Sequence, residues 1–327
     1  MKNLILKFCC FFLIGMSFSP VLAQENYFVV KDSITKEQLP YTTIDFLNGY
    51  GVFSNENGKV VLNEEFPEKI KVSFVGYEAK EILLANVSRS DVLLKPSTQM
   101  LKELNVIVEK EDIKKRKEFV TKPVLHENIN RMYWSSLGQQ YAFYIPNERK
   151  RGVLQSVSIP LIVKDLYQGM TEASFENKPY GTMMKIEFME NVADEPGEKL
   201  YDYDKTFVVH SGKISKKIDI DFQQKVPIPE EGLFVVLTVL GKTDEAGVYV
   251  PELPYNIREV QGVKRKFIKI ILPNYPLVEA PKGALTLFRH VFDDNKKWHR
   301  INRPMVYKRG EEYPNYNIGI GYAITGY

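Results

Sequence analysis

The chain has 327 residues, 44 of them lysine or arginine and 41 aspartate or glutamate, so its formal net charge is +3. This near-balance gives no indication of nucleic-acid binding. Both cysteines, Cys9 and Cys10, lie in the first ten residues. The rest of the chain therefore has no disulfide, no cysteine metal ligand and no cysteine nucleophile.

Residues 1–23 have the pattern of a secretory signal peptide. Lys2 and Lys7 precede an apolar run at 8–18, and Ala23 ends a stretch suited to cleavage. The run is too short for a comfortable membrane span, and no later segment reaches the roughly 18 apolar residues of a spanning helix. We expect an exported protein of the periplasm or the outer-membrane surface, with no transmembrane span after cleavage. A retained N-terminal anchor is the alternative.

Residues 24–96 contain short apolar segments separated by polar turns, the pattern of a β-sandwich. In chain order the segments are residues 27–30, 42–46, 51–54, 60–62, 70–75, 82–84 and 92–94. Asn57-Gly58 is a strong hairpin signal because both residues tolerate positive φ. These segments, with the high aromatic content and scarce helical periodicity of the whole chain, predict an all-β protein whose first domain has seven strands.

A series of short motifs runs through this domain in a fixed order. The motifs are Leu39-Pro40, Gly51, Ser54-Asn55, Asn57-Gly58 and Ser73-Phe74-Val75-Gly76-Tyr77. The series resembles the carboxypeptidase regulatory-like domain of exported Bacteroidetes proteins. The resemblance implies a seven-stranded prealbumin- or transthyretin-like Greek key without activity of its own. Turns and strand ends account for these residues without a ligand, and zinc carboxypeptidase chemistry is not expected.

A connector is expected at residues 97–139. Residues 100–108 resemble the segment that follows this domain in TonB-dependent outer-membrane receptors, but the chain has neither the length nor the repeated membrane strands of their barrel. The charge run at 109–118 predicts a solvated linker or a short helix. A basic contact with an anionic surface is the alternative.

Residues 140–327 again show short strands between turns. The strands are expected at residues 141–145, 152–159, 183–190, 216–222, 233–240 and 266–272. Met184, Ile186 and Phe188 alternate with charged residues, which predicts one buried face, and the continuous apolar run 233–240 predicts a strand in the middle of a sandwich.

Four segments of this half resemble a C-terminal module that often follows the regulatory-like domain. They are Lys185–Glu190, Glu195-Pro196-Gly197, Ile218–Phe222 and Pro229–Val236. The resemblance implies a second, jelly-roll-like β-sandwich, and it implies no defined activity.

The sequence contains no recognisable catalytic or nucleotide-binding motif. His290 and His299 could join Asp293 and Asp294 around a metal, but the segment reads first as a hairpin loop. Two pairs of carboxylates share a strand face, Asp202 with Asp204 and Asp219 with Asp221. Such pairs suit calcium or glycoside hydrolysis, or simply the wet face of a half-exposed strand. We predict no enzyme activity, no cofactor and no metal.

Aromatic side chains are the remaining candidates for ligand binding, because sugar rings stack on Trp and Tyr. The candidate residues are Trp134, Tyr201, Tyr203 and Trp298, and most aromatics in a β-sandwich belong to its core.

The sequence therefore favours a non-catalytic cell-envelope protein that acts as a scaffold, an adhesion protein or a ligand-binding accessory. Its partner is expected to be an envelope protein or a glycan. The alternatives are a carbohydrate-binding accessory of a TonB-linked uptake system and a hydrolase with an unrecognised site.

Overall fold

The computed structural model describes twelve stretches of the chain. They are residues 26–87, 90–97, 117–126, 128–148, 152–162, 181–210, 216–279, 284–293, 295–304, 309–310, 312 and 314–326. At 129, 201 and 202 only the backbone is described. The predicted signal peptide (1–23) and most of the charge run (109–118) lie outside these stretches.

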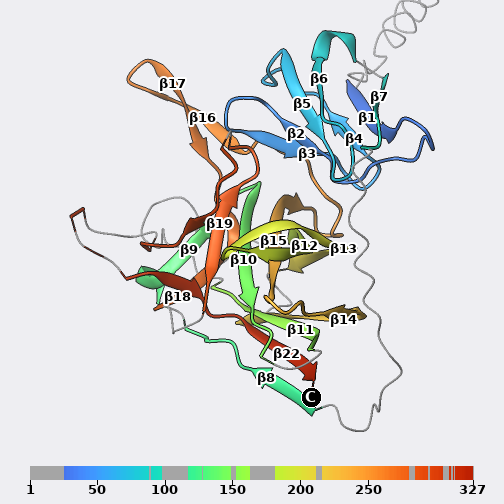
Figure 1. Ribbon diagram of the computed structural model, residues 1–327. Helices are drawn as coiled ribbons and strands as arrows, with labels where there is room; N and C mark the ends of the chain where they lie inside the picture. Colours follow the sequence, from blue (N-terminus) through green and yellow to red (C-terminus); the bar gives the residue numbers. More distant parts are fainter. Residues whose placement is uncertain are drawn as a thin grey trace, which may run out of the picture.

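The described residues are all-β, as predicted (Figure 1). Within these stretches there are strands β1 to β22 and two short 3-10 turns, η1 (Leu84–Asn86) and η3 (Ile129–Arg131), and no α-helix. No helix of the described part is long and apolar enough to cross a membrane.

The first unit, residues 26–97, has strands at all seven predicted positions. They are β1 (Tyr27–Asp32), β2 (Thr43–Asp45), β3 (Gly51–Phe53), β4 (Lys59–Val61), β5 (Lys69–Ser73), β6 (Lys80–Leu83) and β7 (Ser90–Leu94). One sheet has the order β4-β1-β7, with β1 and β7 parallel, and the other the order β3-β2-β5-β6. Both sheets bury side chains in one cluster, Phe28 from the first and Ile44 and Ile70 from the second.

The Asn57-Gly58 turn predicted from the sequence connects β3 to β4. The side-chain oxygen of Asn55 accepts the backbone N–H groups of Asn57, at 3.0 Å, and Lys59, at 2.9 Å. Gly58 has a φ of +67°, and a Cβ there would lie 2.6 Å from the Val30 carbonyl oxygen. The turn therefore requires glycine both for its backbone angle and for its closeness to β1.

A hydrogen bond between Asp32 and Tyr77 joins two distant parts of the first unit. The Tyr77 hydroxyl donates to Asp32 Oδ2 at 2.7 Å, and the backbone N–H of Thr35 donates to Oδ1 at 3.0 Å. The Tyr77 bond and the backbone bonds hold the pKa of Asp32 below its usual value. Burial and the bond to Asp32 raise the pKa of Tyr77 to about 12. Tyr77 also packs edge to face on Phe74.

We predict that Tyr77→Phe lowers the free energy of unfolding at neutral pH. The difference between the variant and the unsubstituted protein should be smaller at both pH extremes. The Asp32 contribution is present above its unfolded pKa, about 3.9, and is lost as the pH falls through the lowered folded value. The Tyr77 contribution is present below its unfolded pKa, about 10, and is lost as the pH rises through the raised value. Urea unfolding from pH 3 to 11 measures the difference, with Tyr27→Phe as the control. A difference that is constant across this range would contradict the prediction.

The second unit begins at residue 117. Its strands are β8 (Lys117–Thr121), β9 (Met132–Ser135), β10 (Gln139–Ile145), β11 (Val153–Pro160), β12 (Gly181–Val192), β13 (Glu195–His210), β14 (Lys217–Pro227), β15 (Leu233–Thr243), β16 (Tyr255–Val260), β17 (Val263–Ile268), β18 (Ile271–Glu279), β19 (Thr286–His290), β20 (His299–Arg300), β21 (Tyr316–Ile318) and β22 (Gly321–Gly326). Two of them, β8 and β9, lie inside the predicted connector (97–139), and they pair with β22 and β18.

Four sheets make up this unit, with the orders β13-β12-β15-β10-β19-β20, β14-β11-β22-β8, β21-β18-β9 and β16-β17. The six-stranded sheet is curled (Figure 1). Its inner face shares the largest buried cluster with the four-stranded sheet, through side chains such as Phe143, Phe188 and Leu154.

Strand β15 confirms the predicted central strand, because it lies between β12 and β10 and nine consecutive residues from Leu233 are buried. The prediction of one strand over 266–272 is wrong. Strand β17 ends at Ile268 and β18 begins at Ile271, because the chain leaves the β16–β17 hairpin there and enters a different sheet.

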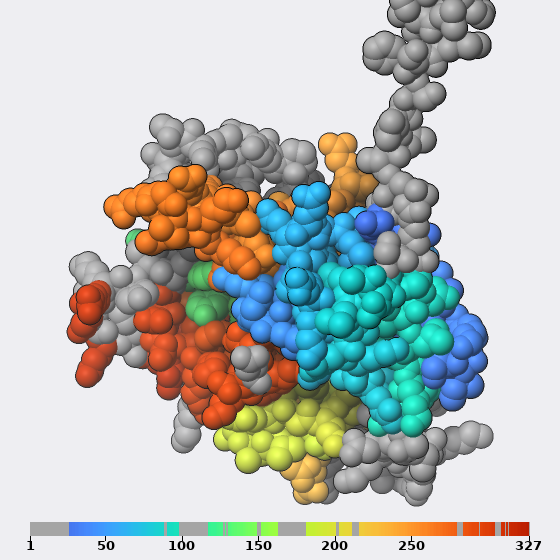
Figure 2. Space-filling model, turned by 90° about the horizontal axis from the view of Figure 1, so that it is seen from above, coloured from blue at the N-terminus to red at the C-terminus, as the bar shows by residue number. Residues whose placement is uncertain are grey.

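The two units lie against each other (Figure 2), and aromatic pairs join them. Phe53 lies 5.6 Å from Phe292, ring centre to ring centre, and belongs to the buried cluster of the second unit. Tyr50 lies 4.8 Å from Tyr255, and Tyr41 lies 6.4 Å from Tyr249, both edge to face. Offset and edge-to-face pairs of this kind contribute about 0.5–1.5 kcal/mol each beyond the area they bury.

Two glycines leave the space that the Phe292 ring fills. Phe292 is completely buried. A Cβ on Gly51, in the first unit, would overlap the ring, and a Cβ on Gly138 would lie 2.6 Å from Phe292 Cε2. Since Gly138 also has a φ of +84°, the junction requires glycine there.

We predict that Gly138→Ala destabilises the protein more than Gly262→Ala. Both positions have positive φ, +84° and +78°, but nothing lies within 4 Å of a Cβ on Gly262. Each alanine costs about 1–2 kcal/mol of backbone strain, and the overlap with Phe292 adds about 1–3 kcal/mol at position 138 alone. Urea unfolding of the two variants measures this difference, and equal losses would contradict it.

Candidate functional site

A cavity of about 200 Å³ lies at the junction of the two units. The first unit contributes Gly49 and Tyr50 to its wall. The second unit contributes Trp134, Ser136, Leu137, Gln139, Pro254, Ile268, Phe288, Arg289, His290, Asp293 and His299. Three aromatic rings therefore share the cavity with amide, guanidinium, imidazole and carboxylate groups.

The ends of three neighbouring elements place these side chains together. Trp134 lies half-buried on β9, and the turn after β9 leads directly into Gln139 at the start of β10. Gln139 pairs in register with His290 at the end of β19. Alternation along β19 points Phe288 and His290 to one face and Arg289 to the other. The ends of β10 and β19 therefore present side chains from both faces of the sheet to the cavity.

Arg289 belongs to a row of polar side chains that crosses the six-stranded sheet. Lys185, Thr238, Gln140 and Arg289 are successive partners in register on β12, β15, β10 and β19. Arg289 Nε donates to Gln140 Oε1 at 2.7 Å, and Gln140 Nε2 donates to Thr238 Oγ1 at 2.8 Å. These bonds fix the Arg289 guanidinium at the wall of the cavity.

The other end of the row is also charged and buried. Lys185 pairs with Glu187 at 3.0 Å, and their side chains are 17% and 5% exposed. A second hollow, of about 440 Å³, lies over this end and is lined by Lys185 and Lys199 of the second unit and by Thr43 and Phe74 of the first. The charges that the sequence placed opposite the apolar face of β12 are therefore largely covered, because the first unit lies beside them.

Trp298 packs beneath Arg289. The guanidinium carbon lies 4.2 Å from the Trp298 ring centre. Trp298 is only 9% exposed, and its indole nitrogen has no hydrogen-bond partner within the described part of the chain. Burial lowers the pKa of Arg289, and the negative charge of Glu187 opposes this lowering. A guanidinium remains charged at any physiological pH.

Burial lowers the pKa of His290, which favours the neutral imidazole, despite the opposing charge of Asp293 and a hydrogen bond with the Leu137 backbone. Its Nδ1 is buried without a hydrogen-bond partner in the described residues. A neutral imidazole donates from one nitrogen and accepts at the other, so with one nitrogen bonded to the Leu137 backbone the remaining Nδ1 of His290 can accept a hydrogen bond.

The structure places the four candidate ligand-binding residues differently. Trp134 lines the cavity, whereas Trp298 is buried beneath Arg289 rather than exposed. Tyr203 stacks on Phe188 at 5.7 Å and packs against the core. The side chain of Tyr201 lies outside the described residues.

The histidines and carboxylates considered as metal ligands form no metal centre among the described residues. His290, Asp293 and His299 do line one cavity, but no group of three His, Cys, Asp or Glu side chains among the described residues could hold a metal ion. Asp294 and the side chain of Asp202 lie outside those residues. Asp204 pairs with Lys199 at 3.6 Å.

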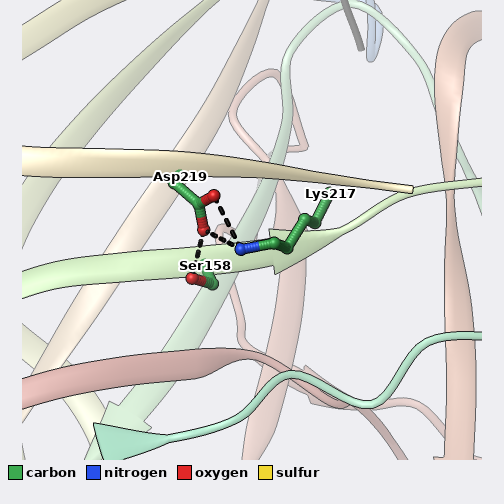
Figure 3. A network of polar contacts seen from close by, with 3 residues as sticks. All are labelled: Ser158, Lys217 and Asp219. Carbon is green, nitrogen blue, oxygen red and sulfur yellow. Dashed lines mark hydrogen bonds and ion pairs between the residues drawn. The ribbon is translucent and has the colours of Figure 1, made fainter. Parts of the chain in front are cut away.

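Asp219 and Asp221 both lie exposed on β14, as the wet-face interpretation predicted. Asp219 accepts two 2.7 Å hydrogen bonds from the Lys217 ammonium and one from the Ser158 hydroxyl (Figure 3). These bonds hold the pKa of Asp219 below its usual value. A carboxylate already bonded to a lysine and a serine on an open strand has no need of a metal to balance its charge.

Sequence reasoning missed Tyr50, Gln139 and Arg289. The available signal was the placement of Gln140 and Arg289 inside otherwise apolar strands, since a polar residue there is usually hydrogen-bonded when buried.

Comparison with known proteins adds no assignment for this site: the chain matches no protein-family model and no curated protein.

We predict that Arg289→Met lowers the free energy of unfolding by about 1–3 kcal/mol, because it leaves the buried Gln140 oxygen without its donor. It should also change the fluorescence emission of Trp298, which loses its cationic neighbour. Arg300→Met is the control, since Arg300 is exposed on the adjacent strand β20 and its loss should cost less than about 0.5 kcal/mol. Equal losses in the two variants would show that the row of bonds does not stabilise the sheet.

Proposed function

We propose that this chain is a non-catalytic, exported protein of the bacterial cell envelope that binds a saccharide in the junction cavity. Export and the choice between periplasm and outer surface rest on the signal-like sequence of residues 1–23. The protein would act as a ligand-binding accessory, for example beside a TonB-linked uptake system, to which the segment at 100–108 points.

We further propose that the first unit is a transthyretin-like sandwich and the second a jelly-roll-like sandwich. The transthyretin-like fold of the first unit is supported by its sheets of three and four strands, which share one core. The jelly-roll-like fold of the second unit is supported by the six- and four-stranded sheets that share a second, larger core.

The placement of Trp134 in the junction cavity carries the saccharide proposal. Aromatic faces bind the apolar C–H faces of a sugar ring, while Gln139, Arg289 and His290 offer donors and acceptors for its hydroxyl groups. Drug-sized ligands occupy pockets of roughly 300–1,000 Å³. A cavity of about 200 Å³ is therefore suited to one ring, such as the terminal residue of a glycan.

We predict that Trp134→Ala weakens saccharide binding at least about tenfold, the equivalent of roughly 1.4 kcal/mol of stacking, whereas Trp134→Phe keeps most of it. A glycan array of the mature chain identifies the saccharide, and calorimetry with that saccharide measures the variants. Tyr27→Ala is the control, because Tyr27 lies half-buried on β1 and does not line the cavity. Absence of binding to every glycan on the array would reject the saccharide proposal.

A hydrolase is the second candidate, because Ser136, His290 and Asp293 line the same cavity. Nucleophilic catalysis requires a hydrogen bond between the serine and its base. His290 is instead bonded to the Leu137 backbone and packs against Phe292, 5.5 Å away. The same preparations would be incubated with chromogenic esters and glycosides. Turnover that His290→Gln abolishes would replace the binding proposal with this one.

A further inference from the structure

The β16–β17 hairpin projects from the second unit (Figure 1), and Figure 2 shows it at the edge of the molecule. All six residues of β17 and four of the six in β16 are exposed. At its base Lys266 lies over the rings of Tyr255, at 4.3 Å, and Tyr50, at 5.2 Å. A two-stranded hairpin is marginally stable alone in water, so these base contacts hold an element that is otherwise surrounded by solvent.

The net positive charge of the protein is concentrated on this hairpin. Its strands contain four lysines and arginines and one glutamate, a net charge of +3. Without residues 1–23, which contain Lys2 and Lys7 and no acidic residue, the chain has a formal charge of +1, so its residues outside these two strands carry a net charge of −2. A locally positive surface on a neutral protein attracts anions.

The face opposite the Tyr255 contact combines cationic and apolar side chains. Register places Arg258 directly opposite Arg265, and Val260 directly opposite Val263, on this face. The two guanidinium groups therefore concentrate positive charge on this face. Val263 is 56% exposed and Phe267 42% exposed.

Such a mixture matches the boundary of an anionic bilayer. Apolar side chains enter the boundary between headgroups and acyl chains, and each Lys or Arg near an anionic membrane surface strengthens binding. We propose that the β16–β17 hairpin docks the protein on an anionic lipid surface, with Val260, Val263 and Phe267 entering the boundary and Arg258 and Arg265, on the same face, contacting the phosphates. This surface is separate from the saccharide cavity, and either proposal can fail without the other.

Vesicle co-sedimentation of the mature chain tests the proposal. The protein should bind vesicles of phosphatidylcholine mixed with phosphatidylglycerol, bind pure phosphatidylcholine far less, and dissociate as salt is added. The double variant Arg258→Glu/Arg265→Glu should bind at least about tenfold more weakly, because it reverses two charges on the docking face.

The matched control is Lys117→Glu/Lys225→Glu, which changes the net charge equally on exposed positions of β8 and β14. It should keep the binding. A second variant, Val263→Asp, removes an apolar contact at the hairpin tip and should weaken binding as well. Circular dichroism checks that each variant is folded. Failure to bind anionic vesicles, equal binding to neutral ones, or an equal loss in the control would each overturn the proposal.

Discussion

The burial of one phenylalanine, Phe292, determines how the two halves of this protein meet. Its ring fills the space that Gly51 of the first unit and Gly138 of the second leave open, and it contacts Phe53 across the junction. Because interiors are close-packed, such a ring fixes the distance between the surfaces around it. The junction cavity depends on that distance, since the first unit contributes Tyr50 to its lining and the second unit contributes Trp134.

The junction also explains why charged side chains are buried on the outer face of a sheet. An isolated sheet would expose Lys185, Glu187 and Arg289 to water. In the folded protein Lys185 borders a hollow that it shares with the first unit, and Arg289 packs on Trp298 of its own unit. Burial of a charge is tolerated only when it is paired and hydrogen-bonded. The pair of Lys185 with Glu187 and the bonds from Arg289 to Gln140 meet that requirement. The site therefore combines a rigid polar wall with an aromatic one.

Local patterns predicted most strands, because alternation and turn residues act over a few positions. The seven strands of the first unit, the Asn57-Gly58 turn and the central strand β15 all follow from such patterns. The break at residues 269–270 did not, since apolar and basic residues continue through it and only the partner strands change. The burial of Trp298 and of the β12 charges depends on residues far away in the chain, and no local pattern contains that information.

The candidate site was only partly predictable for the same reason. Trp134 was identified from its chemistry, but Tyr50 and Arg289 reach the cavity through contacts between the units. Tyr203 shares the chemistry of Trp134, yet it stacks on Phe188 because β13 turns this residue toward the core. Residue type indicates what a side chain can bind, and the packing of the two units determines which side chains line the cavity.

The pairing of strands distant in the chain has a consequence for the order in which this protein can assemble. Strand β1 pairs with β7, and β22 pairs with both β8 and β11. Each unit therefore completes a sheet only when its final strand arrives, and closing loops of that length is slow. Until β22 inserts, the facing edges of β8 and β11 present open backbone groups that other chains could pair with. A chaperone that shields these edges during synthesis would protect the nascent protein from aggregation.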